Sequence, residues 1–153
     1  MKFQWKNSLR TATIYLIVVI ITLGGHTYYQ AYKTQEYVDE FKALKGQSVI
    51  GEISDTYKST IEHYSNYKLN KEAKHKIIRK LNKLSEELRK IDLQINSRDV
   101  YHQIDFSFIY HDIKLVNITL SDTTKDDIVP VIVLHAMEGL GEIKKEITYI
   151  EYR

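Results

Sequence analysis

The sequence has no cysteine among its 153 residues, which removes several kinds of structure and chemistry at once. Disulfide bonds, thiol nucleophiles and thiolate metal ligands are excluded, and so is the attachment of a lipid to an N-terminal cysteine. The folded domain must therefore be stabilised by packing alone. Twelve tyrosines against only four phenylalanines predict a core whose polar hydroxyl groups reach its edge.

Acidic residues are absent before Glu36, and a long apolar run lies within this region. Eight of the ten residues from Ile14 to Leu23 are Leu, Ile or Val, which favours membrane insertion by roughly 2.5 to 5 kcal/mol. A helix continued to Tyr29 spans about 28 Å, close to the ~30 Å hydrocarbon layer of a bilayer. The sequence therefore predicts a transmembrane signal-anchor helix over residues 11–29.

The basic tail of residues 1–10 predicts the orientation of this helix. Its three lysines and arginines precede the apolar run, and positively charged flanks stay in the cytoplasm. We expect a single-pass protein of the cell membrane, with residues 1–10 in the cytoplasm and residues 30–153 outside. A cleaved signal peptide is the alternative, but the best match to a small-residue cleavage pattern, residues 22–24, is poor.

Two helical segments follow the apolar run. Residues 26–45 are predicted to continue the membrane helix outward, and Gly46 is predicted to stop it. Residues 47–53 are consistent with either a short strand or a linker. A second helix is expected to begin at Ser54 or Asp55, because either side chain can accept a hydrogen bond from a free N–H group of the first turn.

The strongest periodic signal is an apolar stripe in the middle of the chain. Asn70 offers an N-cap, and a helix is expected from there to about Leu93. The apolar stripe consists of Ile77, Leu81, Leu84, Leu88, Ile91 and Ile95, at alternating spacings of four and three residues. It covers about two and a half heptads, which is short for a coiled coil. We expect it to pack on the apolar face of the predicted sheet, and a dimer interface is the alternative.

From residue 100 onward the apolar pattern changes to a period of two, which is typical of strands. Residues 100–110 would place Ile104, Phe106 and Phe108 on one face of a half-buried strand. Further strands are predicted over residues 113–120, 128–136 and 142–152. The predicted fold class is α+β: an N-terminal transmembrane helix, then two or three helices packed on a four-stranded antiparallel β-meander.

Residues suited to catalysis or metal binding form no motif in the sequence. The six histidines are scattered and contain no H-E-x-x-H pattern. Asp122, Asp126 and Asp127 share a loop but lack the spacing of a calcium site. The segment Gly139-Leu140-Gly141 lacks the third glycine of a dinucleotide-binding loop. We therefore predict no catalytic, cofactor-binding or metal-binding residues, and no cofactor.

Charge is distributed unevenly along the chain. Residues 68–90 carry a net charge of +6, and residues 91–153 carry −5. A basic helix outside the cell could bind anionic lipid headgroups, anionic wall polymers or another envelope protein, and no nucleic acid is expected. An ordinary solvated helix face is the alternative. The candidate polyanion-binding residues, named here the basic face, are Lys76, Arg79, Lys80, Lys83 and Lys90.

The predicted layout resembles two groups of envelope proteins. A hydrophobic N-terminal helix followed by helices and a terminal sheet resembles pilin-like subunits, although the Gly-Phe processing site and the early glutamate of those proteins are absent. It also resembles some accessory subunits of secretion channels. The sequence predicts a membrane-anchored, non-catalytic binding or assembly protein of the bacterial cell envelope. A pilin-like or secretion-channel accessory subunit and a small cell-envelope hydrolase are the alternatives.

Overall fold

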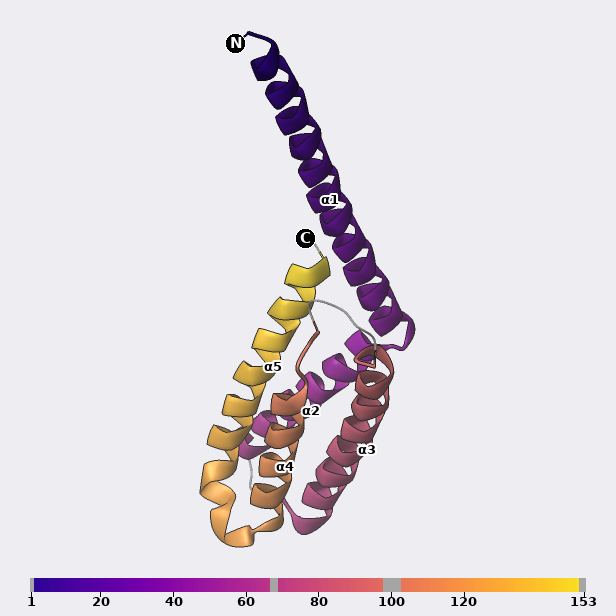
Figure 1. The fold of residues 1–153 in the computed structure, drawn as a ribbon. Helices are drawn as coiled ribbons and strands as arrows, with labels where there is room; N and C mark the ends of the chain where they lie inside the picture. The colour runs from indigo at the N-terminus through magenta and orange to yellow at the C-terminus, as the bar shows by residue number, and fades with distance from the viewer. Residues whose placement is uncertain (1, 67–68, 98–102, 152–153) are drawn as a thin grey trace.

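The structure is a computed structural model that describes residues 2–66, 69–97 and 103–151. Over these residues it contains five α-helices and one short 3-10 helix, and no β-strand. Figure 1 shows the helices in chain order. Their bounds are α1 Lys2–Ala43, α2 Gly46–Asn66, α3 Lys71–Ile95, α4 Ser107–Ser121, η1 Thr123–Ile128 and α5 Val129–Glu151.

Helices α2 to α5 form a four-helix bundle whose neighbouring helices run in opposite directions (Figure 1). Each of α2 and α4 packs against both α3 and α5, whereas α3 and α5 do not contact each other in the described part of the chain. Helices α3 and α5 therefore form opposite flanks of the bundle. Buried side chains from α1 to α5 meet in one continuous core.

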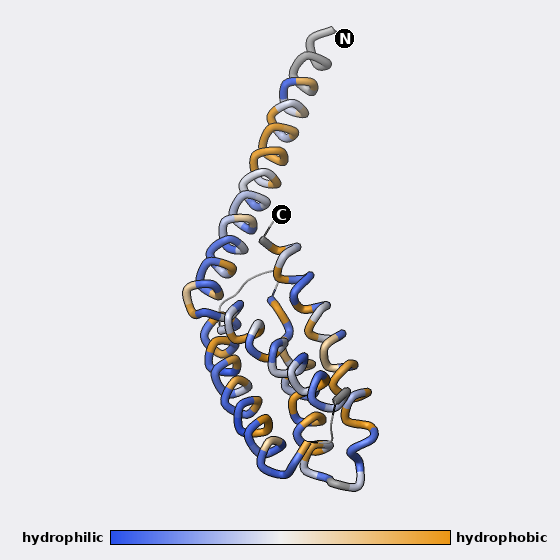
Figure 2. Tube along the Cα trace, turned by 180° about the vertical axis from the view of Figure 1, so that it is seen from behind, coloured by the Kyte–Doolittle hydropathy of each residue, from blue (hydrophilic) through white to orange (hydrophobic). Residues whose placement is uncertain are grey.

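Helix α1 extends far beyond the bundle and leaves its apolar part uncovered. Figure 2 shows this apolar stretch in the middle of the projecting helix, away from the bundle. The stretch begins at Leu9 and is not buried, and the helix is long and apolar enough to cross a membrane. The predicted continuation of the helix over residues 26–45 is confirmed, with its end at Ala43.

The last turns of α1 are fixed to one end of the bundle. Tyr37, Val38 and Phe41 are buried there, and the ring of Phe41 stacks on that of Phe106, with 5.7 Å between the ring centroids. Gly46 lies under the Phe41 ring, because a Cβ on this glycine would fall 2.0 Å from a Phe41 ring carbon. The role predicted for Gly46 was thus wrong in detail, since Gly46 begins α2 and Lys45 takes the left-handed backbone conformation between the helices.

Helix α2 also begins earlier than the sequence pattern suggested. It starts at Gly46, so residues 47–53 are neither a strand nor a linker, and Ser54 and Asp55 lie inside the helix instead of capping it. Val49, Ile50 and Ile53 are all buried. They extend the predicted apolar face by two turns and stabilise this part as helix through packing.

Helix α3 confirms the central prediction from the sequence. The Asn70 side chain accepts a hydrogen bond of 2.8 Å from the backbone N–H of Ala73, as an N-cap does. Five members of the apolar stripe are buried, and Ile77 is partly buried. The stripe packs against the neighbouring helices of its own bundle, instead of on a sheet.

The predicted β-meander is wrong, because the described residues of all four predicted strands lie mainly in helices. The segment from 103 to 106 is irregular, α4 begins at Ser107, and Val100 and His102 lie outside the described residues. In a helix, spacings of three and four residues select the buried face. Ile104 in the irregular segment is buried, and from Phe106 onward the buried apolar residues follow that spacing: Phe106, Ile109, Ile113, Val116 and Leu120. Phe108, predicted to be on the buried face of a strand, is 65% exposed.

The strands predicted in the C-terminal region are also wrong, because this region is helical. Ile128 ends η1, while residues 129–151, which include most of the predicted strands 128–136 and 142–152, form one helix, α5. Its buried residues are again three and four apart: Val129, Val133, Ala136, Leu140, Ile143, Ile147 and Ile150. Pro130 is in the first turn of α5, where its missing N–H has no partner to lose. The domain of residues 30–153 is therefore all-α in its described part.

Candidate binding surfaces

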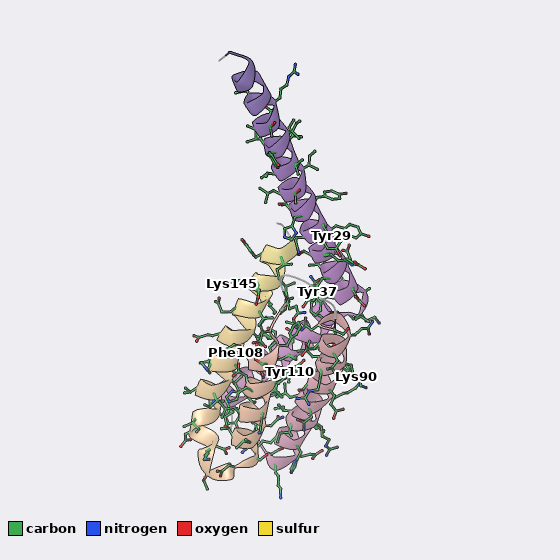
Figure 3. The ribbon with its side chains drawn as sticks, in the orientation of Figure 1. Tyr29, Tyr37, Lys90, Phe108, Tyr110 and Lys145 are labelled. Atoms are coloured by element: carbon green, nitrogen blue, oxygen red, sulfur yellow. The ribbon has the colours of Figure 1, made fainter. Side chains whose placement is uncertain are left out.

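The basic face lies on the side of α3 that points away from the core. Its five side chains are all exposed, while the apolar stripe on the other side of the helix is buried. This separation follows from the spacing of 3.6 residues per turn, which keeps the five positions off the stripe. Lys90 is labelled in Figure 3, at the outer edge of the bundle. The structure thus brings all five predicted residues together on one flank.

Ion pairs along α3 neutralise only part of this charge. Lys76 pairs with Glu72 at 3.3 Å, and Lys83 pairs with Glu87 at 3.6 Å. Both are exposed pairs of one helix and contribute little to stability. Arg79, Lys80 and Lys90 have no ion-pair partner within the described residues. The basic face therefore keeps a positive surface available to a partner.

Arg89 extends the positive surface around α3 into a groove between α3 and α4. The guanidinium group of Arg89 lies over the Tyr110 ring, 5.2 Å from its centroid. The groove has a volume of about 720 Å³ and also exposes Lys114. Its two walls are joined by a hydrogen bond of 2.7 Å from Asn117 Nδ2 to Asn82 Oδ1. Lys114 was not among the residues predicted from the sequence, because it comes from a different helix and only the fold brings it near Arg89.

A hydrogen-bond network fixes the end of α3 that lies nearest to α1. The Tyr37 hydroxyl donates to Asn96 Oδ1 at 2.9 Å and accepts from the backbone N–H of Ile104 at 3.0 Å. Asn96 in turn donates to Asp92 Oδ1 at 2.6 Å, and the Tyr110 hydroxyl donates to Asp92 Oδ2 at 2.8 Å. Burial raises the pKa of Tyr37 to about 12. The network therefore holds α1, α3 and α4 in one arrangement.

Lys74 belongs to the same basic segment but has a structural role. It is buried, and its ammonium group forms an ion pair with Asp126 of η1. The Tyr64 hydroxyl donates to the same carboxylate oxygen at 3.4 Å, and burial together with the Asp126 charge raises the pKa of Tyr64 to about 12. These contacts tie η1 to α2 and α3 at the end of the bundle opposite α1 (Figure 1).

A second groove, named here the α4–α5 groove, lies on the flank of the bundle opposite α3. Its lining differs in chemistry from that of the groove between α3 and α4. It has a volume of about 590 Å³ and a mostly apolar lining from Phe108, Ile143 and Tyr149. Its polar rim is mainly acidic, with Asp105, Glu142 and Glu146, while Lys145 on the rim pairs with Glu142 at 2.7 Å. Figure 3 labels Phe108 and Lys145 on this flank.

Polar side chains near the middle of the bundle form no catalytic arrangement in the described residues. Asp112 is buried, its pKa is raised by that burial, and its Oδ2 lies where a Cβ on Gly139 would be 2.9 Å away. His111 is 3.8 Å from Asp112, but its side chain is 74% exposed. His135, in the segment 128–136 that was predicted to be a strand, is exposed on α5. Among the described residues, no group of three or more His, Asp and Glu side chains is arranged to hold a metal ion.

Comparison with known proteins gives no match: no protein-family model, no curated protein and no solved structure aligns significantly with the chain. The resemblance to pilin-like and secretion-channel subunits depended on a terminal sheet, and the structure has α4 and α5 in its place. What the fold defines is an all-α bundle joined to a long, apolar N-terminal helix.

Proposed function

We propose that this chain is a single-pass, membrane-anchored and non-catalytic protein of the cell envelope that binds an anionic partner through the basic face of α3. The observation that supports the anchor is the uncovered apolar stretch of α1, which continues as one helix into the core of the bundle. Leaving so many large apolar side chains in water would be unusual for a soluble domain. A rigid helix of this kind would hold the bundle at a fixed height above the membrane.

The position of the basic face favours some partners over others. Lys76 and Lys80 lie in the half of α3 that is remote from α1, and Lys83 lies at its middle (Figure 1). Lys76 is nineteen residues from the other end of α3 at Ile95, or about 28 Å along the helix axis. Exposed charges are screened within ~8 Å at physiological ionic strength. This distance favours a wall polymer or an acidic protein surface over the headgroups of the anchoring membrane.

The proposed topology predicts a protected N-terminus and an accessible bundle. Positive charges before the apolar run should keep residues 1–10 inside, so protease added to intact spheroplasts should digest the bundle. N-terminal sequencing of the mature chain should return residue 1 or 2. Protection of the bundle would reverse the topology, and a mature chain beginning near Gly25 would show that the helix is a cleaved signal instead of an anchor.

Reversing three charges of the basic face should abolish binding to an anionic polymer. The full chain in neutral detergent should co-sediment with cell-wall fragments that retain their anionic polymers, and less so as salt rises. The variant Lys76→Glu, Lys80→Glu, Lys83→Glu should lose this binding and keep its helical circular dichroism, because all three side chains are exposed.

A matched variant controls for net charge in this experiment. Lys58→Glu, Lys125→Glu and Lys144→Glu change the net charge equally, but these exposed residues lie on α2, η1 and α5. The control should retain most of the binding. Equal losses in the two triple variants would mean that only overall charge matters, and binding that resists ~1 M salt would exclude an electrostatic contact.

A further inference from the structure

We propose that α3 also binds a second copy of this chain, whose α4–α5 groove receives the membrane-proximal half of α3, around Lys90 and Leu93. This inference depends on the proposed function, since it adds an acidic protein surface as a partner of the same basic helix at a different height. It predicts that copies anchored in one membrane associate side by side. Three features of the bundle support this contact: the placement of the two flanks, their chemistry and their height along the bundle.

The two surfaces lie on opposite flanks of one bundle. Helices α3 and α5 do not contact each other in the described structure, and α2 and α4 lie between them (Figures 1 and 2). Copies that share a membrane also share one orientation, so a lateral neighbour can present its α5 flank to the α3 flank. A two-fold arrangement would instead bring two basic faces or two acidic rims together, which like-charge repulsion disfavours.

The chemistry of the two flanks is complementary. On α3, Leu93 is 70% exposed, and Lys90 lies one turn before it on the same side of the helix. In the α4–α5 groove, Phe108 and Tyr149 line an apolar surface bordered by acidic side chains. An apolar side chain beside a cation on one flank therefore matches an apolar groove with an acidic rim on the other.

The heights of the two surfaces also agree. Figure 3 labels Lys90 and Phe108 on opposite sides of the bundle at nearly the same level along its long axis. Two copies anchored at the same depth would therefore bring these residues together without sliding along the membrane normal. Such a contact joins two different surfaces of neighbouring copies, so it can be repeated from copy to copy. The copies form a closed ring if the rotations between neighbours add up to a full turn, and an open row if they do not.

Cysteine cross-linking can test this contact cleanly, since the natural chain has no cysteine. Full-length Leu93→Cys and Phe108→Cys chains, mixed in proteoliposomes and oxidised, should give a cross-linked dimer. Neither chain alone should do so efficiently, and a Lys58→Cys chain, with its cysteine on α2, measures random collisions. A Leu93→Cys chain that cross-links to itself as efficiently as to Phe108→Cys would overturn the proposal.

Charge reversal and its rescue separate a direct contact from a general effect on structure. Adding Lys90→Glu to the Leu93→Cys chain should lower the cross-linking yield about tenfold, the equivalent of ~1.4 kcal/mol. Adding Glu142→Lys and Glu146→Lys to the Phe108→Cys chain should restore it. Lack of rescue would show that these residues do not meet across the interface.

Cross-linking and wall-polymer binding, considered together, distinguish failure of this inference from failure of the proposed function. Cross-linking no greater than that of Lys58→Cys, with wall-polymer binding that still depends on Lys76, Lys80 and Lys83, would leave the anionic partner as a polymer and exclude the second copy. Loss of both signals would remove the proposed function as well. Cross-linking that is strong and rescued, without any polymer binding, would support the second copy alone.

Discussion

Replacing Leu88 with alanine is expected to lower the free energy of unfolding by about 2 to 5 kcal/mol, the range for truncating a large buried side chain. Leu88 is completely buried in the apolar stripe of α3, between Leu84 and Ile91. Alanine at this position would remove its packing contacts and leave a cavity in the bundle. Urea denaturation followed by circular dichroism at 222 nm would measure the change.

Leu93→Ala is the matched control for this substitution. Leu93 has the same side chain on the same helix but is exposed, so its truncation should cost less than about 0.5 kcal/mol. A fragment of residues 30–153 suits both measurements, because it keeps Tyr37, Val38 and Phe41, the buried residues of α1. Similar costs for the two variants would mean that the stripe is not the core face of α3.

The helices of the first two thirds of the chain could be predicted because a single periodicity dominates there. In α3 the stripe has spacings of four and three, and the Asn70 cap marks where the helix begins. The continuation of α1 beyond the apolar run was predictable for the same reason. The start of α2 was missed because residues 47–53 are too few to show a period by themselves.

The last third of the chain was misread because two periods coexist in it. Residues 104, 106 and 108 alternate as in a strand, while Phe106, Ile109 and Ile113 are spaced as in a helix. Isoleucine and valine are common in strands, but this preference is weak and packing overrides it. Long stretches of helical spacing in α4 and α5 allow one face of each helix to be buried against the same core. Weighing those spacings over fifteen residues or more would have favoured helices.

The candidate site was predictable to the extent that it lies on one helix. The basic face follows from the stripe, because positions away from a buried stripe must face outward. The α4–α5 groove was not predictable, since Asp105 and Phe108 meet Glu146 and Tyr149 only after the chain has turned through η1. Lys74 could not be distinguished from the solvated lysines for a similar reason, because its partner Asp126 is distant in sequence.

Removing one partner of the Lys74–Asp126 ion pair is expected to be as costly as a cavity in the core. The side chains of Lys74 and Asp126 are 6% and 15% exposed, so neither charge is well hydrated once its partner is lost. Lys74→Met or Asp126→Asn alone should therefore lower the free energy of unfolding by about 3 to 5 kcal/mol. Either change would also loosen η1 from α2 and α3.

The double variant Lys74→Met, Asp126→Asn should be less destabilised than the sum of the single variants by about 2 kcal/mol or more, because neither unpaired charge remains. Asparagine keeps an oxygen that can accept the hydrogen bond of the Tyr64 hydroxyl. That contact can therefore form in all four proteins that are compared: the natural chain, the two single variants and the double variant. Lys76→Met is the control, since its pair with Glu72 is exposed on the same helix and should contribute less than about 0.5 kcal/mol. The four denaturation curves together measure the coupling. Additive losses would indicate that water reaches this end of the bundle and screens the two charges.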